Sequence, residues 1–193
     1  MNTYCGAYTN YIFPYKFYAI LLIVFVIMSA HAGASAADKA PSYQLPYLGF
    51  HLGAAQVSND SFERSAAYGV LGGVYVFKNT SVELGYTKFE PFDHKRTPGT
   101  WIEVQGATLG IAHRFDLTKW FALRPGVGAH FWNADGYYYG HFTGEDRGMD
   151  LTMNLALLFT VKNRVFFMLN TRWLDSVSGA DIWHQSLGAG VNF

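Results

Sequence analysis

The chain has 193 residues, of which 50% are hydrophobic, 18% aromatic and 15% charged, and its formal net charge is zero. Disordered chains combine low hydrophobicity with high net charge, so this composition excludes disorder. A neutral chain also lacks the basic character that nucleic-acid binding requires. The single cysteine excludes a disulfide framework and a cysteine-based zinc site. Few charges together with many aromatic residues point towards a membrane protein.

The first 36 residues have the features of a secretory signal peptide. Lys16 precedes an apolar run from Phe17 to Met28, and small residues then offer Ala-x-Ala cleavage sites at 30–32 and 34–36. A basic segment, a short apolar segment and such a site describe a cleavable leader. The apolar run is shorter than the roughly 20 residues of a spanning helix, and a retained anchor is the alternative. Residues 37–44 are expected to form a short linker.

Beyond residue 45, apolar residues recur at every second position, which is the period of a β-strand. Eight such segments are predicted, at 47–57, 66–77, 81–89, 107–115, 121–131, 149–161, 165–173 and 182–193. The face opposite the large apolar residues carries mainly Gly, Ala and Thr with a few charges, which suits a narrow barrel interior better than a solvated surface. A closed barrel is also the only strand structure that satisfies its backbone inside a bilayer.

The predicted fold is therefore all-β: an eight-stranded antiparallel, up-and-down transmembrane β-barrel over residues 45–193. The segment 149–161 has the longest apolar face, and four of its residues are expected to contact lipid: Leu151, Met153, Leu155 and Leu157. A soluble lipocalin-like barrel is the alternative architecture. Short connections at 78–80, 116–119 and 162–163 alternate with longer ones at 58–65, 90–100, 134–148 and 174–181. This alternation predicts periplasmic turns at one end and outer loops at the other.

Three stretches resemble the OmpA-type family of eight-stranded outer-membrane barrels, which includes OmpX-like proteins: SVELGYTKF at 81–89, LRPGVGAHFWNADG at 123–136 and SLGAGVNF at 186–193. The resemblance implies a location in the outer membrane of a Gram-negative bacterium, in contact with the lipid bilayer and lipopolysaccharide. It also implies that the C-terminal Phe193 is part of a signal read by the outer-membrane assembly machinery. The family's peptidoglycan-binding domain is not expected here.

Strand parity places several polar residues inside the predicted barrel: His51, Glu83, Glu103, Arg114, Arg124, His130, Asp150 and Arg172. Charges in a narrow lumen are costly unless they are paired. Four of these residues are therefore predicted to form a charge network that plugs the lumen, as in related barrels: Glu83, Arg124, Asp150 and Arg172. A narrow conducting pore is the alternative.

An enzymatic alternative rests on His184 and Ser186, which resemble the His-x-Ser pair of the lipid A deacylase PagL. A hydroxyl nucleophile needs a base within hydrogen-bond reach and an acid that orients the base. Parity directs both side chains into the lumen rather than towards acyl chains, and no acid follows on a later strand. A non-enzymatic role is therefore favoured.

The longest predicted loop, residues 134–148, is rich in aromatic side chains, namely Tyr137, Tyr138, Tyr139, His141 and Phe142. These residues could contact a host surface or a glycan, or they could belong to the interfacial aromatic belt. Lys95 and Arg96 could meet lipopolysaccharide phosphates. The histidines show no metal-ligand spacing, and no cofactor is expected. The sequence thus predicts a structural outer-membrane protein with a possible role in surface contact.

Overall fold

The computed structural model describes residues 46–161 and 164–193, so the predicted signal peptide and linker lie outside the described residues. This part of the chain forms ten strands, eight long and two of two residues each. The long strands are β1 (Tyr47–Val57), β2 (Ser65–Phe77), β3 (Thr80–Phe89), β5 (Trp101–His113), β7 (Phe121–Tyr138), β8 (His141–Val161), β9 (Val165–Val177) and β10 (Ala180–Asn192). The short ones are β4 (Phe92–Asp93) and β6 (Phe115–Asp116). No described residue belongs to a helix that is long and apolar enough to cross a membrane.

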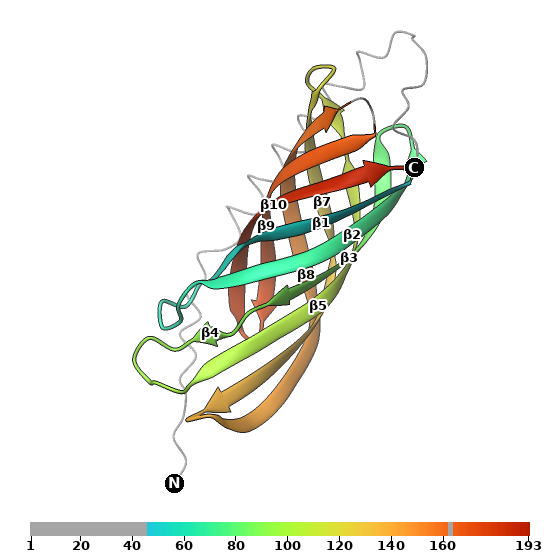
Figure 1. Ribbon diagram of the computed structural model, residues 1–193. Coiled ribbons are helices and arrows are strands. Elements are labelled where there is room, and N and C mark those ends of the chain that lie inside the picture. The colour runs from blue at the N-terminus through green and yellow to red at the C-terminus, as the bar shows by residue number, and fades with distance from the viewer. Residues whose placement is uncertain (1–45, 162–163) are drawn as a thin grey trace, which may run out of the picture. The chain divides into compact units, whose positions relative to one another are not determined.

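The eight long strands close into a barrel in which each strand pairs with its neighbours antiparallel (Figure 1). Each long strand pairs with the next long strand of the chain, from β1–β2 through β3–β5 and β5–β7 to β9–β10. The first and last strands then meet, from Tyr47 opposite Asn192 to Val57 opposite Ile182. The short β4 and β6 pair with β5 and β7. The predicted fold, an eight-stranded up-and-down barrel, is confirmed.

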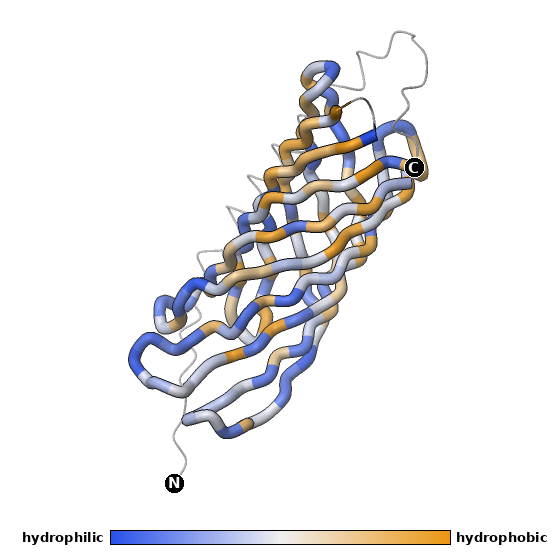
Figure 2. Tube along the Cα trace, in the orientation of Figure 1, coloured by the Kyte–Doolittle hydropathy of each residue, from blue (hydrophilic) through white to orange (hydrophobic). Residues whose placement is uncertain are grey.

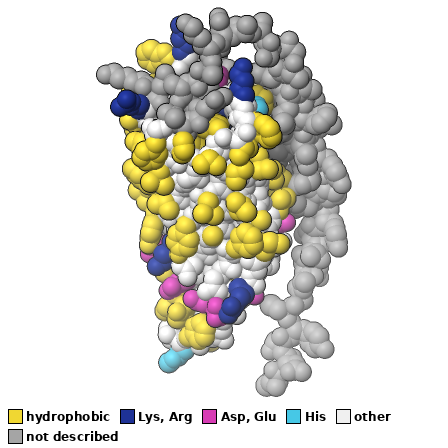
Figure 3. All heavy atoms as spheres, turned by 90° about the vertical axis from the view of Figure 1, so that its right-hand side faces the viewer, with side chains coloured by type: hydrophobic (Ala, Val, Ile, Leu, Met, Phe, Trp, Pro, Cys, Tyr) yellow, Lys and Arg dark blue, Asp and Glu magenta, His cyan; other side chains and the backbone are white. Residues whose placement is uncertain are grey.

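The two faces of the wall differ as the alternation of the sequence requires. On β8, Ala156 and Leu158 are buried in the lumen, whereas Leu155 and Leu157 are 50% and 44% exposed on the outside. Hydrophobic residues recur along the strands of the wall in Figure 2. Figure 3 shows hydrophobic side chains gathered over the middle of one face of the wall, with charged side chains above and below them. This pattern is that of a barrel whose outer wall meets the hydrocarbon core of a membrane.

Glycines on the inner face leave room for large rings that cross the narrow lumen. A Cβ atom added to Gly190 would lie 2.3 Å from the ring of Phe166, and one added to Gly73 would lie 2.4 Å from the ring of Tyr47. Both distances are far below a van der Waals contact, so a larger residue at either position would displace the ring. The barrel interior is thus filled by pairing glycine on one strand with an aromatic residue on another.

The core consists of two apolar layers inside the barrel. One, the loop-end cluster, lies near the longer connections and contains Val57, Phe89, Phe92, Val104, Trp132, Leu174 and Ile182 among others. The other, the turn-end cluster, lies near the short turns and contains Tyr47, Leu71, Leu158, Phe166 and Met168 among others. Between them, buried polar side chains form a polar layer: His51, Thr87, His130, Thr152, Asn170, Arg172, His184 and Ser186. Apolar side chains therefore gather in the lumen towards both of its ends.

The β7–β8 hairpin differs from the prediction. Residues 134–148 are not a loop, because β7 continues to Tyr138 and β8 begins at His141. The turn uses positive φ angles at Tyr139 (47°) and Gly140 (79°), the conformation of a tight two-residue hairpin. Pairing of β8 with β9 begins only at Thr152. The first half of β8 therefore extends beyond β9, and Figure 1 shows the hairpin projecting from the barrel.

Candidate functional site: the lumen and the projecting hairpin

A buried ion pair lies in the lumen towards the turn end. Arg124 on β7 is 3% exposed, and its Nη1 atom lies 2.8 Å from Oε1 of Glu83 on β3. The Tyr47 hydroxyl donates a hydrogen bond to the same carboxylate, and Arg124 Nη1 donates to the Tyr47 oxygen at 3.1 Å. Ser81 Oγ lies 3.3 Å from the carboxylate as a further donor. This cluster links β1, β3 and β7 across the barrel.

The four residues of the predicted charge network all lie on the inner face, but the structure brings only Glu83 and Arg124 together. Arg172 is 8% exposed and donates a hydrogen bond from Nη1 to Thr87 Oγ1 at 3.2 Å. Asp150 accepts a hydrogen bond from Trp132 Nε1 at 2.6 Å. Glu83 and Arg124 lie at one level of the lumen, whereas Asp150 and Arg172 bond to other side chains, so the four residues do not form one hydrogen-bonded network.

Glu103 was expected inside the barrel and lies on the outer face instead. The register of β5 against β7 runs without a shift from Trp101 to Ala112, so no bulge changes the parity of this strand. Val104 is buried in the loop-end cluster, and Glu103 must therefore point the other way. Its carboxylate accepts a hydrogen bond from Trp101 Nε1 at 3.2 Å. The inward placement of Glu103 is wrong because the alternation continues unbroken along β5 and puts Glu103 on the face opposite to Val104.

Two members of the cluster around Arg124 were missed by sequence reasoning. Tyr47 is the first residue of β1, and it is 4% exposed and hydrogen-bonded to both charged partners. Ser81 looks like an ordinary small lumen residue. The signal that could have revealed this role is a tyrosine at an inward-facing position of a strand that is rich in glycine.

His184 and Ser186 lie on the inner face of β10, as parity predicts, and are 0% and 3% exposed. Neither ring nitrogen of His184 nor the Ser186 hydroxyl has a hydrogen-bond partner among the described residues. The His184 ring instead packs against His51 and Phe89, with centroid distances of 5.3 and 5.8 Å. A nucleophile needs a hydrogen-bonded base, and this pair lacks that contact.

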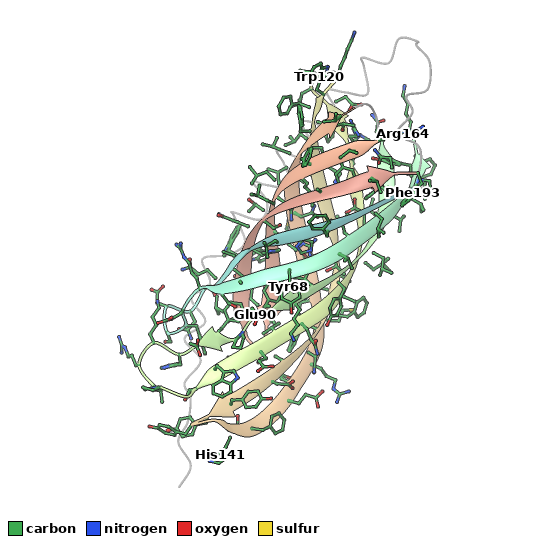
Figure 4. The ribbon with its side chains drawn as sticks, viewed as in Figure 1. Tyr68, Glu90, Trp120, His141, Arg164 and Phe193 are labelled. Atoms are coloured by element: carbon green, nitrogen blue, oxygen red, sulfur yellow. The ribbon has the colours of Figure 1, made fainter. Side chains whose placement is uncertain are left out.

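The expected lipid-facing residues all lie on the outer face of β8. Leu155 and Leu157 are exposed, and Leu151 and Met153 are half-buried. Phe193 lies at the turn end and is 64% exposed, and its backbone N–H donates to the Pro46 carbonyl at 2.9 Å. In Figure 4, Trp120, Arg164 and Phe193 mark this end, and Glu90 and His141 lie towards the opposite end.

The tip of the β7–β8 hairpin is a group of aromatic rings in contact with one another. Tyr137 stacks on Trp101 at 4.8 Å and touches Phe142 at 5.7 Å, and Tyr138 packs edge-on against Tyr139 at 4.5 Å. Tyr138, Tyr139 and Phe142 are 52%, 61% and 59% exposed. We call these five residues the aromatic tip. Ring contacts within the tip hold a large apolar area on the surface.

The described residues contain no group of three or more His, Cys, Asp or Glu side chains arranged to hold a metal ion. The profile of the OmpA-like transmembrane domain matches residues 28–181. The chain belongs to this family. A search of curated protein sequences gave no match.

Solved structures share the fold at low sequence identity. Neisserial surface protein A (NspA) aligns with a TM-score of 0.65 and 14% identity, over 81% of this chain and 100% of that one. Ail of Yersinia pestis aligns with a TM-score of 0.57 and 12% identity, over 78% of this chain and 99% of Ail, and Ail has also been solved with the heparin analogue sucrose octasulfate. OprG of Pseudomonas aeruginosa aligns with a TM-score of 0.56 and 12% identity, over 81% and 99% of the two chains.

Family membership and fold together place this OmpA-like protein in the outer membrane of a Gram-negative bacterium. In such barrels the short turns face the periplasm and the longer connections face outward. The turn end of this barrel is therefore its periplasmic end, and the aromatic tip lies on the outer side of the membrane.

Proposed function

We propose that this OmpA-like barrel is a non-enzymatic, non-conducting outer-membrane protein that makes surface contacts through its aromatic tip. The observation that carries the proposal is the projecting hairpin. Its strands extend beyond the pairing with β9, and three rings at its end are more than half exposed. Soluble surfaces rarely keep a contiguous group of exposed aromatic side chains unless the group binds something.

The filled lumen supports a structural role rather than transport. Apolar side chains occupy both the loop-end and the turn-end cluster, and the Glu83–Arg124 pair crosses the lumen between strands. Eight-stranded barrels have an interior that side chains just fill. We therefore expect no steady conductance in planar lipid bilayers. A stable open channel in the purified protein would refute this part of the proposal.

The chemistry of the tip favours contact through ring faces rather than through charge. The rings are followed on β8 by Glu145, Asp146 and Arg147, and Arg147 lies 3.3 Å from Glu145 in an exposed ion pair. The tip therefore offers aromatic area without a cluster of positive charge. Tyr and Phe side chains supply rigid, amphipathic contact area, which suits the apolar faces of sugar rings or a host protein surface. Ail was solved with a sulfated sugar, and that likeness motivates including glycans in the test.

The test replaces the exposed rings and measures cell binding. Cells that display the Tyr139→Ser/Phe142→Ser variant should bind epithelial cells and immobilised glycans at least tenfold more weakly than cells with the unchanged protein. The matched control is Lys95→Ser/Arg96→Ser, which alters the charged β4–β5 connection and leaves the tip intact. Equal binding by the tip variant and the unchanged protein would refute the role of the tip. Loss of binding only in the control variant would show that contact depends on charge instead.

The hydrolase alternative has less support from the geometry. Ser186 and His184 are buried in the polar layer, and no hydrogen bond joins the hydroxyl to the imidazole. An acyl chain would have to enter a lumen in which apolar side chains gather towards both ends. We propose that the pair has no catalytic role, and lipid A from cells with and without the protein should give identical mass spectra.

A further inference from the structure

The first part of β8 has an edge that is not paired with another described strand. β8 begins at His141, whereas its pairing with β9 begins only at Thr152. Between these points, residues 144–150 pair with residues 130–136 of β7 without a shift in register. On their other side, no strand in the described part of the chain pairs with them. We call residues 144–150 the free edge.

Most of the free edge is open to solvent. Residues 144–147 and Met149 are exposed, and Gly148 and Asp150 are half-buried. A Cβ atom added to Gly144 would have no atom within 4 Å apart from its chain neighbours. At about 3.3 Å per residue the free edge spans about 23 Å, which is enough for a strand of ordinary length. It belongs to the hairpin that projects on the outer side of the membrane (Figure 1), where a segment of another protein can reach it.

The opposite edge of the same sheet is covered, whereas the free edge is not. On β5, the short strand β4 pairs Phe92 with Ile102 and Asp93 with Trp101. An exposed row of backbone N–H and C=O groups is a template for pairing with another chain, and proteins block such edges with proline, lysine, bulges or covering segments. The sequence of the free edge, GEDRGMD, contains neither proline nor lysine. Its backbone groups are therefore available to an added strand.

The charge beside the free edge is negative. Glu145 lies opposite Asp135 of β7, and Asp135 lies opposite Glu103 of β5, so three carboxylates form one row across the outer face of the sheet. Like charges directly opposite each other are destabilising. Arg147 lies 3.3 Å from Glu145 and offsets one of these charges, and Asp146 adds a further negative charge to the edge. The row ends at Glu145, so the next position in it belongs to an added strand.

We propose that the free edge binds an extended, basic segment of another protein as an additional β-strand, with a lysine or arginine opposite Glu145. Backbone hydrogen bonds to β8 supply affinity, as in other cases of strand addition to a sheet edge. The cation supplies specificity, because directly opposite side chains have their Cβ atoms about 4.5–5.5 Å apart. The site uses the backbone of β8 rather than the rings of the aromatic tip, and it does not depend on the role proposed for the tip.

The test measures binding of a labelled synthetic peptide to the full protein in lipid nanodiscs. The probe is a short peptide of alternating valine and threonine with one central lysine. It should bind and should slow hydrogen exchange at alternate amides of the free edge, because every second N–H group of an edge strand faces the added strand. The same peptide N-methylated throughout cannot donate backbone hydrogen bonds and should bind about tenfold more weakly or not at all. A peptide with a central glutamate in place of lysine should also bind more weakly.

Two charge reversals provide the matched variants. Glu145→Lys replaces attraction with repulsion at the edge and should weaken binding of the lysine peptide about tenfold. Glu63→Lys makes the same change at an exposed glutamate of the β1–β2 connection and should leave peptide binding unchanged. Failure of the lysine peptide to bind, equal binding of the N-methylated peptide, or unweakened binding to Glu145→Lys would overturn the proposal. Protection of the same amides that rises with protein concentration without peptide would assign the edge to a second copy of the chain and would also overturn it.

Discussion

Replacing Glu83 with glutamine removes the one carboxylate among the described residues that lies within ion-pair distance of Arg124, and it keeps the shape of the side chain. Arg124 is 3% exposed, so its charge would remain buried without a partner. Breaking a buried ion pair in this way costs about 3–5 kcal/mol. The Glu83 side chain is 17% exposed, so we expect a loss near the lower limit, about 3 kcal/mol in the free energy of unfolding. That loss is more than a hundredfold change in the folding equilibrium, at about 1.4 kcal/mol per factor of ten.

The reciprocal variant should behave differently. In Arg124→Met the Glu83 carboxylate keeps the Tyr47 hydroxyl and can take up a proton, whereas a guanidinium cannot lose one. Arg124→Met should therefore cost less than Glu83→Gln, and the double variant should recover most of the loss of Glu83→Gln. Urea-dependent folding in lipid vesicles, followed by heat-modifiable gel migration, measures all three. If Glu83→Gln unfolds within 1 kcal/mol of the unchanged protein, or if the double variant is less stable than both single variants, the pair does not contribute as argued.

Three further predictions concern the wall, the polar layer and the C-terminus. Leu155→Arg should lower barrel stability by about 2–4 kcal/mol, because the side chain lies on the lipid-facing wall. Asn154→Arg should not show this cost of placing a charge in lipid, because residue 154 faces the lumen. A soluble mature chain, or normal folding of Leu155→Arg, would contradict the lipid-facing assignment. Ser186→Ala should leave lipid A mass spectra unchanged and should not reduce stability, because the buried hydroxyl has no partner to lose; a changed lipid A profile would refute a non-catalytic Ser186. Deleting Phe193 should reduce the amount of assembled barrel in cells without abolishing refolding in detergent, and equal amounts in the outer membrane would argue against an assembly signal.

The sequence alone could predict which residues face lipid and which face the lumen, because successive side chains of a strand point to opposite faces. On β8, Leu155 and Leu157 must face opposite to Ala156 and Leu158 in any flat or closed sheet, and burial follows this parity. The pattern also located the short turns near 78–80 and 116–119, and the predicted turn at 162–163 lies outside the described residues. It could not extend β7 and β8 to the aromatic tip, because a stretch containing ADG, GE and DRG has the composition of a loop. The projecting hairpin is held by pairing between β7 and β8 and by the Trp101–Tyr137 stack. Neither contact can be predicted from the alternation of apolar and polar residues.

Lumen contacts were less accessible to sequence reasoning. Parity identifies which side chains point inward, but the level of each one depends on the stagger between strands. Glu83 and Arg124 meet because β3 and β7 bring them to one level, and Asp150 lies closer to the loop end, beside Trp132. The position of Tyr47 between the two charges also depends on this stagger. These contacts needed the register of the closed sheet.

The junction between β1 and β10 joins parts of the chain that are far apart in sequence. Tyr47 pairs with Asn192, a separation of 192 − 47 = 145 residues. Every other neighbouring pair of long strands is joined by a local connection, so this contact closes the largest loop and carries the largest entropic cost. The barrel can therefore complete its backbone hydrogen bonds only after the whole chain is available, and we expect closure of this junction to limit the rate of folding. Because Phe193 N–H already bonds to the Pro46 carbonyl, a circular permutant that joins these ends and opens the Tyr139–Gly140 turn would move the chain ends to the outer side and still preserve all eight strand pairings.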